Sequence, residues 1–555
     1  MPSVFRALAP LAAAALATAT LTLPAGTASA ATWPVPVALS GVPGNAEGTH
    51  VAISPDGTAT AALVAYDEPS DSFRVLASSR PPRGTWSTPV PLSAPSVVST
   101  EPAIAIGPDG TTTIAWRLAP SEDDFVVQAA TRSPGGGWSP AQSLSQLSTD
   151  EYTSGGTNPQ VRLAAASDGT VTAVWPQWIT DPVENHFDLQ AATRAASGTW
   201  SAPETFDDTL DGLEWEYRTP EVAAGPTGQV AVVWGVAGGT GAGAYVRTRQ
   251  GAGPWSPGQR LGNGYWGGRP DLAYAPDGTL GVVWTGGFNT PTVTTLPPGG
   301  QWATPRVLSQ TTVRYAELDL AAGPGSGFVA TWTSDETADQ DRVYVATGGP
   351  TGPWATQALA PAASGTPVVA VKTDGTAVVM WLWNPPTVND YAIQASVRPP
   401  GGAWEAPSTV RDLPADYYSS ENVALTSGPG GSLAAMWAEY DTADIGTAYA
   451  VSQDPAVPDT GRITGPKRIK PGKKGSFAFT GPAGAAYECR VDKTRKQQHG
   501  KTDAARKRPV PWKACTSPHK VKTRKLKPGK HTLYVRAVQF GLTDPTPSAR
   551  KFKVK

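Results

Sequence analysis

Helical periodicity is nearly absent from this 555-residue chain after its first thirty residues. Almost no later segment repeats its apolar residues with the 3.6-residue period of an amphipathic helix. Short apolar, β-branched and aromatic segments instead alternate with Gly, Pro, Asn and Asp, and the chain holds 59 glycines and 55 prolines. This pattern predicts an all-β protein. The 20 tryptophans exclude a disordered chain, because such residues need burial.

Motifs of common hydrolases and metal sites are also missing. The chain contains neither a Gly-x-Ser-x-Gly turn nor a His-Glu-x-x-His sequence. It has five histidines, none of which belongs to a recognisable metal-binding pattern. No glycine-rich phosphate loop opens a helix. The sequence therefore excludes the usual serine-hydrolase, zinc-protease and phosphate-loop classes.

Long hydrophobic runs are absent except at the N-terminus. Arg6 precedes an apolar stretch from Ala7 to Leu23, and Ala28-Ser29-Ala30 offers small residues for cleavage. We therefore predict a signal peptide at 1–30 and a secreted, extracellular mature protein. A membrane anchor is the alternative, but the stretch is short and rich in Ala and Thr. No later segment reaches about 18 apolar residues, so no transmembrane segment is expected.

Lysine is almost confined to one end of the chain. Only Lys372 precedes residue 459, and 17 lysines follow it. Residues 31–458 carry 18 Lys and Arg against 41 Asp and Glu, a net charge of −23, whereas 459–555 carry 26 against 5, a net charge of +21. Such a change predicts two domains. We place them at 31–455 and 462–555, with a linker at 456–461.

One pattern recurs eight times before the linker. A short apolar strand leads into an Asp-Gly-type turn, and a second strand then ends in an aromatic residue. Asp and Gly form such hairpins because they tolerate the positive φ of a tight turn. The turns are Asp56-Gly57, Asp109-Gly110, Asp168-Gly169, Thr227-Gly228, Asp277-Gly278, Gly325-Ser326, Asp374-Gly375 and Gly430-Gly431, and the closing aromatics are Tyr66, Trp116, Trp175, Trp234, Trp284, Trp332, Trp381 and Trp437.

A second hairpin follows in each repeat, and its last strand begins with Trp-Ser-x-Pro or a variant. Spacings between these tryptophans run from 47 to 62 residues. Four short strands per repeat at this period are typical of β-propeller blades. The tryptophans are Trp33, Trp86, Trp138, Trp200, Trp255, Trp302, Trp354 and Trp404. We expect them to fill the spaces between blades rather than to bind a ligand.

The phase of the repeats predicts how the ring closes. The chain begins with a lone fourth strand near Trp33, and the last repeat, around 423–452, lacks a fourth strand of its own. We therefore predict an eight-bladed β-propeller in which the N-terminal strand closes the last blade and removes an open edge. An open β-solenoid or two smaller propellers is the alternative.

The loops that enter blades four, five and six combine aromatic residues, arginines and acids. Glu221, Asp271 and Asp319 stand at equivalent distances before their turns. We expect them at the mouth of the central channel on three adjacent blades, where loops on a rigid scaffold carry function. Paired carboxylates perform acid/base chemistry in glycosidases, so these three are the catalytic candidates if the protein is an enzyme.

The other residues of these loops predict a binding site. Arginine binds carboxylates at two points, and aromatic faces stack on sugar rings. The alternative is that each arginine pairs with a neighbouring acid and only holds its loop. The predicted ligand-binding residues are Tyr217, Arg218, Tyr265, Trp266, Arg269, Arg314 and Tyr315.

Acidic residues also cluster in the loops between second and third strands. Most acidic loops are solvated surface, but clustered carboxylate oxygens also suit Ca²⁺. No loop matches an EF-hand, and no other cofactor is expected. The clusters include Glu122, Asp123 and Asp124; Asp335, Glu336, Asp339 and Asp341; and Glu439, Asp441 and Asp444.

The two cysteines both lie in the basic C-terminal region. In an exported protein, Cys489 and Cys515 predict one disulfide bond. Closing a loop of about 25 residues stabilises by roughly 3–4 kcal/mol on the chain-entropy model, which matters for so small a domain. Zinc binding suits this spacing poorly.

The segments around these cysteines resemble a known module. Tyr487-Glu488-Cys489-Arg490-Val491-Asp492, Cys515-Thr516-Ser517-Pro518 and the stretch 526–537 are similar to a bacterial Ig-like domain common in secreted actinobacterial proteins. This resemblance covers about 90 residues and implies a β-sandwich with the disulfide, used as a spacer or adhesion unit. The many Lys and Arg residues, notably in 493–508, depart from that family.

The propeller repeats, with Pro-Asp-Gly-Thr and Trp-Ser-x-Pro, are similar to those of secreted bacterial propellers in the broad sialidase-like superfamily. The Asp-box of sialidases has another residue between Asp and Gly, and their propeller has six blades. The resemblance therefore implies fold and export, and little about sialidase activity.

These observations together lead to a prediction of function. We expect a non-enzymatic extracellular binding protein whose propeller binds a glycan or other ligand and whose basic domain associates with anionic cell-envelope polymer through its charge. Docking of the basic domain on its own propeller, or a basic surface that is only solvated, is the alternative for that charge. Nucleic acid is not an expected partner, because few aromatics are interleaved with the basic residues. A glycoside hydrolase or lyase that uses the channel-mouth carboxylates is the alternative function.

Overall fold

The computed structural model describes residues 33–39, 45–67, 70–97, 102–121, 124–149, 160–179, 186–207, 220–236, 241–264, 270–335, 341–361, 363–384, 391–414, 417–419, 423–443, 445–493 and 510–555. These residues form strands, turns and three 3-10 helices, η3 (Gly287–Asn289), η4 (Pro429–Gly431) and η5 (Thr523–Lys525). The prediction of an all-β protein is therefore confirmed. Within the described part of the chain, no helix has the length and apolar character needed to cross a bilayer.

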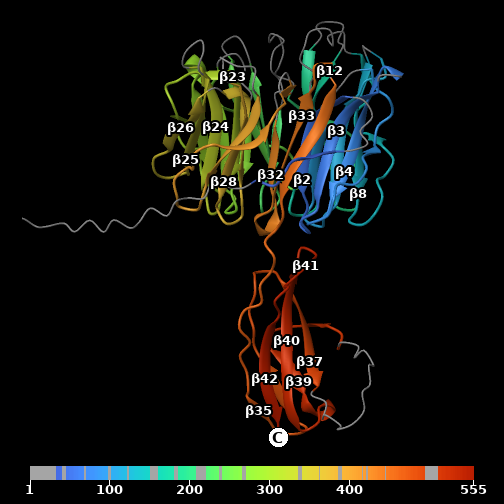
Figure 1. Cartoon of the computed structure of the whole chain (residues 1–555). Coiled ribbons are helices and arrows are strands. Elements are labelled where there is room, and N and C mark those ends of the chain that lie inside the picture. The colour runs from blue at the N-terminus through green and yellow to red at the C-terminus, as the bar shows by residue number, and fades with distance from the viewer. Residues whose placement is uncertain are drawn as a thin grey trace, which may run out of the picture.

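Antiparallel sheets stand side by side in the upper body of the molecule (Figure 1). Each sheet is built from hairpins, so strands that are consecutive in sequence are neighbours in the sheet. The inner strands are β2 (Asn45–Ile53), β6 (Ala103–Ile106), β11 (Arg162–Ala165), β15 (Glu221–Ala224), β19 (Asp271–Tyr274), β23 (Val313–Ala322), β27 (Ala363–Val371) and β32 (Ala424–Ser427). The second strands are β3 (Ala59–Asp67), β7 (Thr112–Leu118), β12 (Val171–Ile179), β16 (Gln229–Val236), β20 (Leu280–Thr285), β24 (Phe328–Asp335), β28 (Ala377–Trp383) and β33 (Leu433–Tyr440).

The remaining strands complete the sheets on their outer side. The third strands are β4 (Ser72–Arg80), β8 (Asp124–Arg132), β13 (His186–Arg194), β17 (Gly243–Gln250), β21 (Pro291–Leu296), β25 (Asp341–Gly348), β29 (Ala392–Arg398) and β34 (Gly446–Gln453). The outermost strands are β5 (Val90–Pro91), β9 (Gln142–Ser143), β14 (Glu204–Asp207), β18 (Gln259–Asn263), β22 (Arg306–Val307), β26 (Ala355–Pro361), β30 (Ser408–Asp412) and β1 (Val37–Ala38), while β10 (Ser148–Thr149) and β31 (Tyr418–Ser419) add to the edges of two sheets.

The inner strands contact one another in sequence, and β32 contacts β2 again. This circle of inner strands makes the fold a β-propeller. The N-terminal strand β1 pairs with β34, so that Val37 lies opposite Ala450. Apolar clusters fill the spaces between neighbouring sheets, and one of them joins Leu63 on β3 to Met436 on β33.

Buried tryptophans occupy one repeated place on the second strands. Trp116, Trp175, Trp234, Trp284, Trp332, Trp381 and Trp437 are each at most 1% exposed. The prediction that Tyr66 is their counterpart on β3 is wrong. Leu63 follows Gly57 by the same six residues that separate Trp116 from Gly110, and it is fully buried, whereas the Tyr66 hydroxyl donates to Asp71 near the surface at 2.8 Å.

The C-terminal residues form a separate β domain below the propeller (Figure 1). Its main sheet contains β35 (Arg468–Ile469), β42 (Ser548–Val554), β40 (Gly529–Gln539), β37 (Ala486–Lys493), β38 (Lys513–Cys515) and β41 (Leu542–Thr543), and its second sheet contains β36 (Lys474–Phe477) and β39 (His519–Lys522). Phe477, Leu533, Val535 and Phe552 pack between the two sheets.

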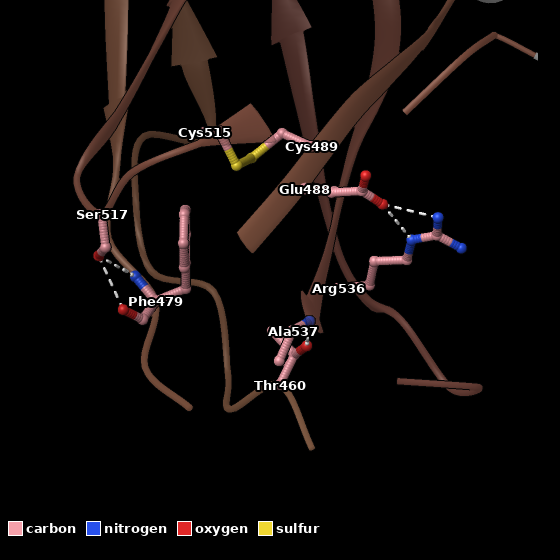
Figure 2. The surroundings of a disulfide bond; sticks show 8 residues. All are labelled: Thr460, Phe479, Glu488, Cys489, Cys515, Ser517, Arg536 and Ala537. Atoms are coloured by element: carbon pink, nitrogen blue, oxygen red, sulfur yellow. Dashed lines mark hydrogen bonds and ion pairs between the residues drawn. A yellow bond between two sulfur atoms is a disulfide. The ribbon is translucent and has the colours of Figure 1, made fainter. Parts of the chain in front are cut away.

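The predicted disulfide between Cys489 and Cys515 is confirmed, and it joins β37 to β38 (Figure 2). Nearby, Arg536 forms an ion pair with Glu488 at 2.6 Å. Thr460, in the predicted linker, accepts the Ala537 N–H through its hydroxyl at 2.7 Å. The segment that leads into the domain is therefore tied to the main sheet.

Candidate functional site

Glu221, Asp271 and Asp319 occupy equivalent places on three neighbouring sheets. Each lies on an inner strand and pairs with the residue directly before a buried tryptophan on the second strand. The inner strands β15, β19 and β23 contact one another in this order. The structure therefore brings the three catalytic candidates together around the centre of the ring.

The same register defines one residue on every inner strand, and we call this set the inner layer. It consists of His50, Ala103, Arg162, Glu221, Asp271, Asp319, Val368 and Ala424. The sequence-based prediction of the site omits Arg162. Arg162 lies seven residues before Gly169, and Glu221 lies seven residues before Gly228. The repeat spacing therefore identifies Arg162 as the counterpart of Glu221.

Arg162 connects its own sheet to the next one. Its Nε donates to Oε1 of Glu221 at 2.8 Å, and its Nη2 donates to Oε1 of Gln160. The two charged side chains are 17% and 25% exposed. This ion pair is therefore fixed in position but still reachable from solvent.

The two aspartates are hydrogen-bonded to the next sheet along the ring. Oδ2 of Asp271 accepts the N–H of Leu320 at 2.6 Å, and Oδ2 of Asp319 accepts the N–H of Val369 at 2.5 Å. The same Leu320 N–H also lies 3.1 Å from Oδ1 of Asp319. The carboxyl groups of Asp271 and Asp319 therefore converge on one backbone donor.

The surroundings of this aspartate pair favour protonated carboxyl groups. Burial raises the pKa of Asp271 well above its ordinary value, and the charges of Asp319 and Glu221 raise it further. Burial also raises the pKa of Asp319, and the backbone N–H donors oppose this effect without cancelling it. Like charges this close cannot all ionise at once. The pair therefore keeps a proton at a pH where exposed aspartates have lost theirs, and both residues remain partly exposed.

A cavity of about 330 Å³ lies farther along the same inner strands. It is lined by Ile106, Pro108, Ala165, Ala166, Ser167, Ala224, Gly225, Pro226, Tyr274, Ala275 and Pro276. Tyr274 follows Asp271 by three residues, about 10 Å along an extended strand. Burial raises the pKa of its hydroxyl, which therefore stays protonated at neutral pH. The cavity provides room for part of a ligand within one strand length of the carboxyl groups.

The side chains of the predicted ligand-binding residues lie outside the described part of the structure. Tyr217, Arg218, Tyr265, Trp266 and Arg269 fall in segments that are not described, directly before β15 and β19. Arg314 and Tyr315 belong to β23, but their side chains are not described. Their role in binding stays a prediction.

The acidic loops contain the predicted calcium ligands, and one of these, Glu439, has an internal partner. Glu439 is buried and receives two hydrogen bonds from Arg411, at 3.0 and 2.9 Å, so it forms an internal ion pair. Across the described residues, the one His, Cys, Asp and Glu cluster with metal-binding spacing is Cys489, Cys515 and His519. Its two sulfurs are joined in the disulfide and do not offer thiolates. Calcium binding therefore stays a prediction.

Comparisons with known proteins give distant likenesses. No family model and no curated protein matches the sequence. The chain is similar to prolyl oligopeptidase B of Galerina marginata (10% identity, TM-score 0.40, covering 73% of this chain and 56% of that one). It is also similar to an ulvan lyase bound to -[GlcA(1-4)Rha3S]- (12% identity, TM-score 0.40, 76% and 98%) and to the NanB sialidase of Streptococcus pneumoniae (12% identity, TM-score 0.35, 76% and 70%).

These neighbours correct the prediction of function. All three are enzymes, which contradicts the expectation of a non-enzymatic binding protein, and that expectation is wrong. Its alternative, a glycoside hydrolase or lyase, takes its place as a proposal. One of the three is a sialidase, the class to whose propellers the repeats were likened from the sequence. Because every one of these TM-scores is below 0.5, the argument for catalysis has to come from the site itself.

Proposed function

We propose that the propeller is an enzyme that cleaves glycosidic bonds in a glycan, by hydrolysis or elimination, at the inner layer. The observation that carries this proposal is a pair of aspartates that converge on one backbone donor, with pKa values raised by burial, beside an ion-paired glutamate. Cleavage needs one group that gives a proton and another that accepts one. The inner layer provides both on a rigid ring.

Asp271 and Asp319 act together as the acid. Carboxyl groups that flank a glycosidic bond from opposite sides stand about 5–9 Å apart. Since the carboxyl groups of Asp271 and Asp319 both accept the Leu320 N–H, they serve as one proton donor, and Glu221 is the second group. Arg162 holds the Glu221 carboxylate in place.

In hydrolysis, the aspartate pair gives its proton to the glycosidic oxygen as the carbon–oxygen bond breaks. Glu221 accepts a proton from the water whose oxygen bonds to the sugar carbon, and this proton then returns to the pair. In elimination from a uronate, Glu221 takes the proton from the carbon beside the carboxylate instead, and the pair again protonates the leaving oxygen. Both routes balance with the same three residues.

The finer architecture is part of the proposal. We infer eight blades, with β1 completing the last one, and its pairing with β34 supports this closure. We assign 31–455 to the propeller, 456–461 to the linker and 462–555 to an Ig-like sandwich, which the two facing sheets support. Export of the chain through residues 1–30 and an actinobacterial origin belong to the same proposal.

A screen of neutral and acidic polysaccharides tests the activity. Reducing ends report hydrolysis or elimination, and ultraviolet absorbance of the unsaturated sugar reports elimination alone. We expect Glu221→Gln, Asp271→Asn and Asp319→Asn each to lower kcat by about a hundredfold or more, because each removes a proton-transfer group. These amide variants conserve shape, and their thermal unfolding is compared with that of the wild type.

Asp277→Asn is the matched control. Asp277 is exposed in the turn after β19 and accepts the N–H of Thr279 at 2.9 Å, away from the inner layer. This variant should keep full activity. Activity that survives in all three inner-layer variants, or glycan binding without cleavage in the whole screen, would refute the proposal.

A further inference from the structure

Positive charge is concentrated at one end of the C-terminal domain. Residues 467–474, 522–530 and 551–555 meet there, and we call them together the cationic tip. The three segments hold 13 Lys and Arg and no Asp or Glu. All 13 basic residues are exposed. Half of the 26 basic residues in 459–555 are therefore gathered at one end, without an acid among them.

Backbone and threonine hydrogen bonds hold the three segments together. The N–H of Lys553 donates to the carbonyl of Lys467 at 2.9 Å. The buried Thr523 hydroxyl contacts the carbonyls of Lys470 and Lys473 at 3.2 and 2.6 Å. Ile469, in the same segment, belongs to the buried cluster of the domain. The cations are thus displayed from a fixed backbone.

Like charges lie directly opposite one another across the strands. Lys553 on β42 is paired with Arg468 on β35 and with Lys530 on β40, which makes a row of three cations. On the second sheet, Lys474 lies opposite Lys522. Such pairs destabilise a sheet when nothing neutralises them. The tip therefore fits an anionic partner that lies across the row.

The described acids of the domain do not supply that anion. Of its five acids, Glu488 pairs with Arg536 at 2.6 Å and Asp492 lies 3.8 Å from Arg490. Asp544 is buried and accepts the Thr460 N–H at 2.9 Å. Asp459 precedes the first strand of the domain, and Asp503 is outside the described residues. None of these acids belongs to the tip.

The described residues of the acidic propeller do not supply it either. The domain meets the propeller through the turn between β40 and β41, where Phe540 packs against Gly430. Lys530 lies at the opposite end of β40, about 30 Å from this turn along an extended strand. In Figure 1 the labels of β35 and β42 lie beside the C-terminus, at the end of the domain away from the propeller.

We infer that the cationic tip binds a linear acidic polysaccharide with repeated uronate groups. Separated lysines and arginines on a rigid edge match repeated single charges, and release of counterions drives such binding. The tip exposes no aromatic side chain on which nucleic-acid bases stack. The choice of a glycan over other polyanions rests on the proposed function, since a bound acidic chain would be held near the propeller.

Affinity electrophoresis of the full chain in gels that contain polygalacturonate tests this inference. At low salt we expect the double variant Lys530→Gln with Lys553→Gln to bind about tenfold more weakly than the wild type. The control, Arg462→Gln with Lys513→Gln, removes the same charge from exposed positions outside the tip and should bind within twofold of the wild type. Neutral dextran should bind neither protein, and added salt should weaken binding to polygalacturonate.

Three results would overturn the inference: equal losses in the tip variant and its control, no retention of the wild type, or tighter binding to duplex DNA or phosphatidylglycerol vesicles than to polygalacturonate. Repeating the measurement with Asp319→Asn separates this inference from the proposed function. This inner-layer variant should bind polygalacturonate as the wild type does, whether or not the propeller cleaves glycans. Loss of cleavage and loss of tip binding are thus independent readouts.

Discussion

Burial raises the pKa of Asp271 and of Asp319, so this pair keeps a proton that exposed aspartates lose near pH 4. In the unfolded chain both carboxyl groups ionise at their ordinary pKa of 3.8, whereas the folded pair holds one proton to a higher pH. The folded protein therefore binds more protons than the unfolded one above pH 4. Its free energy of unfolding should fall as the pH rises through the raised pKa of the pair.

Asp271→Asn tests this dependence. The amide cannot ionise, but its oxygen can still accept the Leu320 N–H. We expect urea unfolding between pH 4 and pH 8 to show a smaller loss of stability in this variant than in the wild type. Asp277→Asn, in the exposed turn, should keep the wild-type slope. Equal slopes for Asp271→Asn and the wild type would mean that the pair holds no extra proton.

Two single residues, Arg162 and Glu439, show which features of the site the sequence did not predict. The repeat spacing places Arg162 at the position equivalent to Glu221, and the two residues form an ion pair. The sequence-based prediction considered only acids at this position, so it did not include an arginine. Glu439 looked like a candidate cation ligand, and its partner Arg411 lies 28 residues earlier, on another sheet. Such long-range ion pairs leave no local signal in one sequence.

At the scale of elements, residues that recur in each repeat allowed the strands and their order to be predicted. Asp-Gly-type turns recur once per propeller sheet, and a buried tryptophan recurs in every propeller sheet but the first, so strand order followed from the sequence, and the β-propeller fold is confirmed. Tyr66 was misassigned because the first sheet has Leu63 in place of the tryptophan. Tyr66, three residues later, is the nearest aromatic residue and was assigned to that place instead. Five of the seven predicted binding residues precede β15 and β19, outside the strands whose register follows from the repeats.

The disulfide between β37 and β38 gives a prediction at this scale. The two cysteines are 26 residues apart, so the chain-entropy model assigns the bond about 3–4 kcal/mol. Replacing both with alanine should lower the calorimetric transition of the C-terminal domain and leave that of the propeller unchanged. Reduction of the wild type should reproduce the shift. An unchanged transition in the double variant would show that the two-sheet core alone sets the stability of this domain.

For the whole molecule, the sequence located two domains of opposite charge, but it did not reveal how they join. The chain leaves β34 through Asp454, which is bound to Arg80 on β4 at 2.8 and 3.2 Å and to the Arg83 N–H at 2.9 Å. Two residues later, the Ala456 N–H donates to the Gly430 carbonyl at 3.0 Å. The joint therefore bridges the first and last sheets of the ring, and we call it the seam.

The turn after β40 packs on the same seam. Phe540 has a φ of 52°, a left-handed conformation that a phenylalanine adopts only where its surroundings hold it there. A Cβ on Gly430 would lie 2.5 Å from Cε2 of this ring, so the contact requires glycine. Closure of the ring and attachment of the C-terminal domain thus depend on one set of contacts.

Asp454→Ala should destabilise both the closure of the ring and the attachment of the C-terminal domain. Hydrogen bonds to charged groups contribute about 1.5–3 kcal/mol each, and this substitution removes three while leaving Arg80 without its partner. We expect a lower propeller transition in calorimetry and faster proteolysis between the domains, whereas Asp459→Ala, at an exposed position, should change neither.

The contribution of Asp454 to the free energy of unfolding depends on pH. Burial raises the pKa of Asp454, but Arg80 and Arg83 lower it by more. The stabilisation is therefore present above the ordinary pKa of 3.8 and is lost as the pH falls through the lowered value. The wild type and Asp454→Ala should therefore differ at neutral pH and converge in acid. A difference that persists in acid would show that packing of Phe540, rather than the Asp454 ion pair, holds the seam.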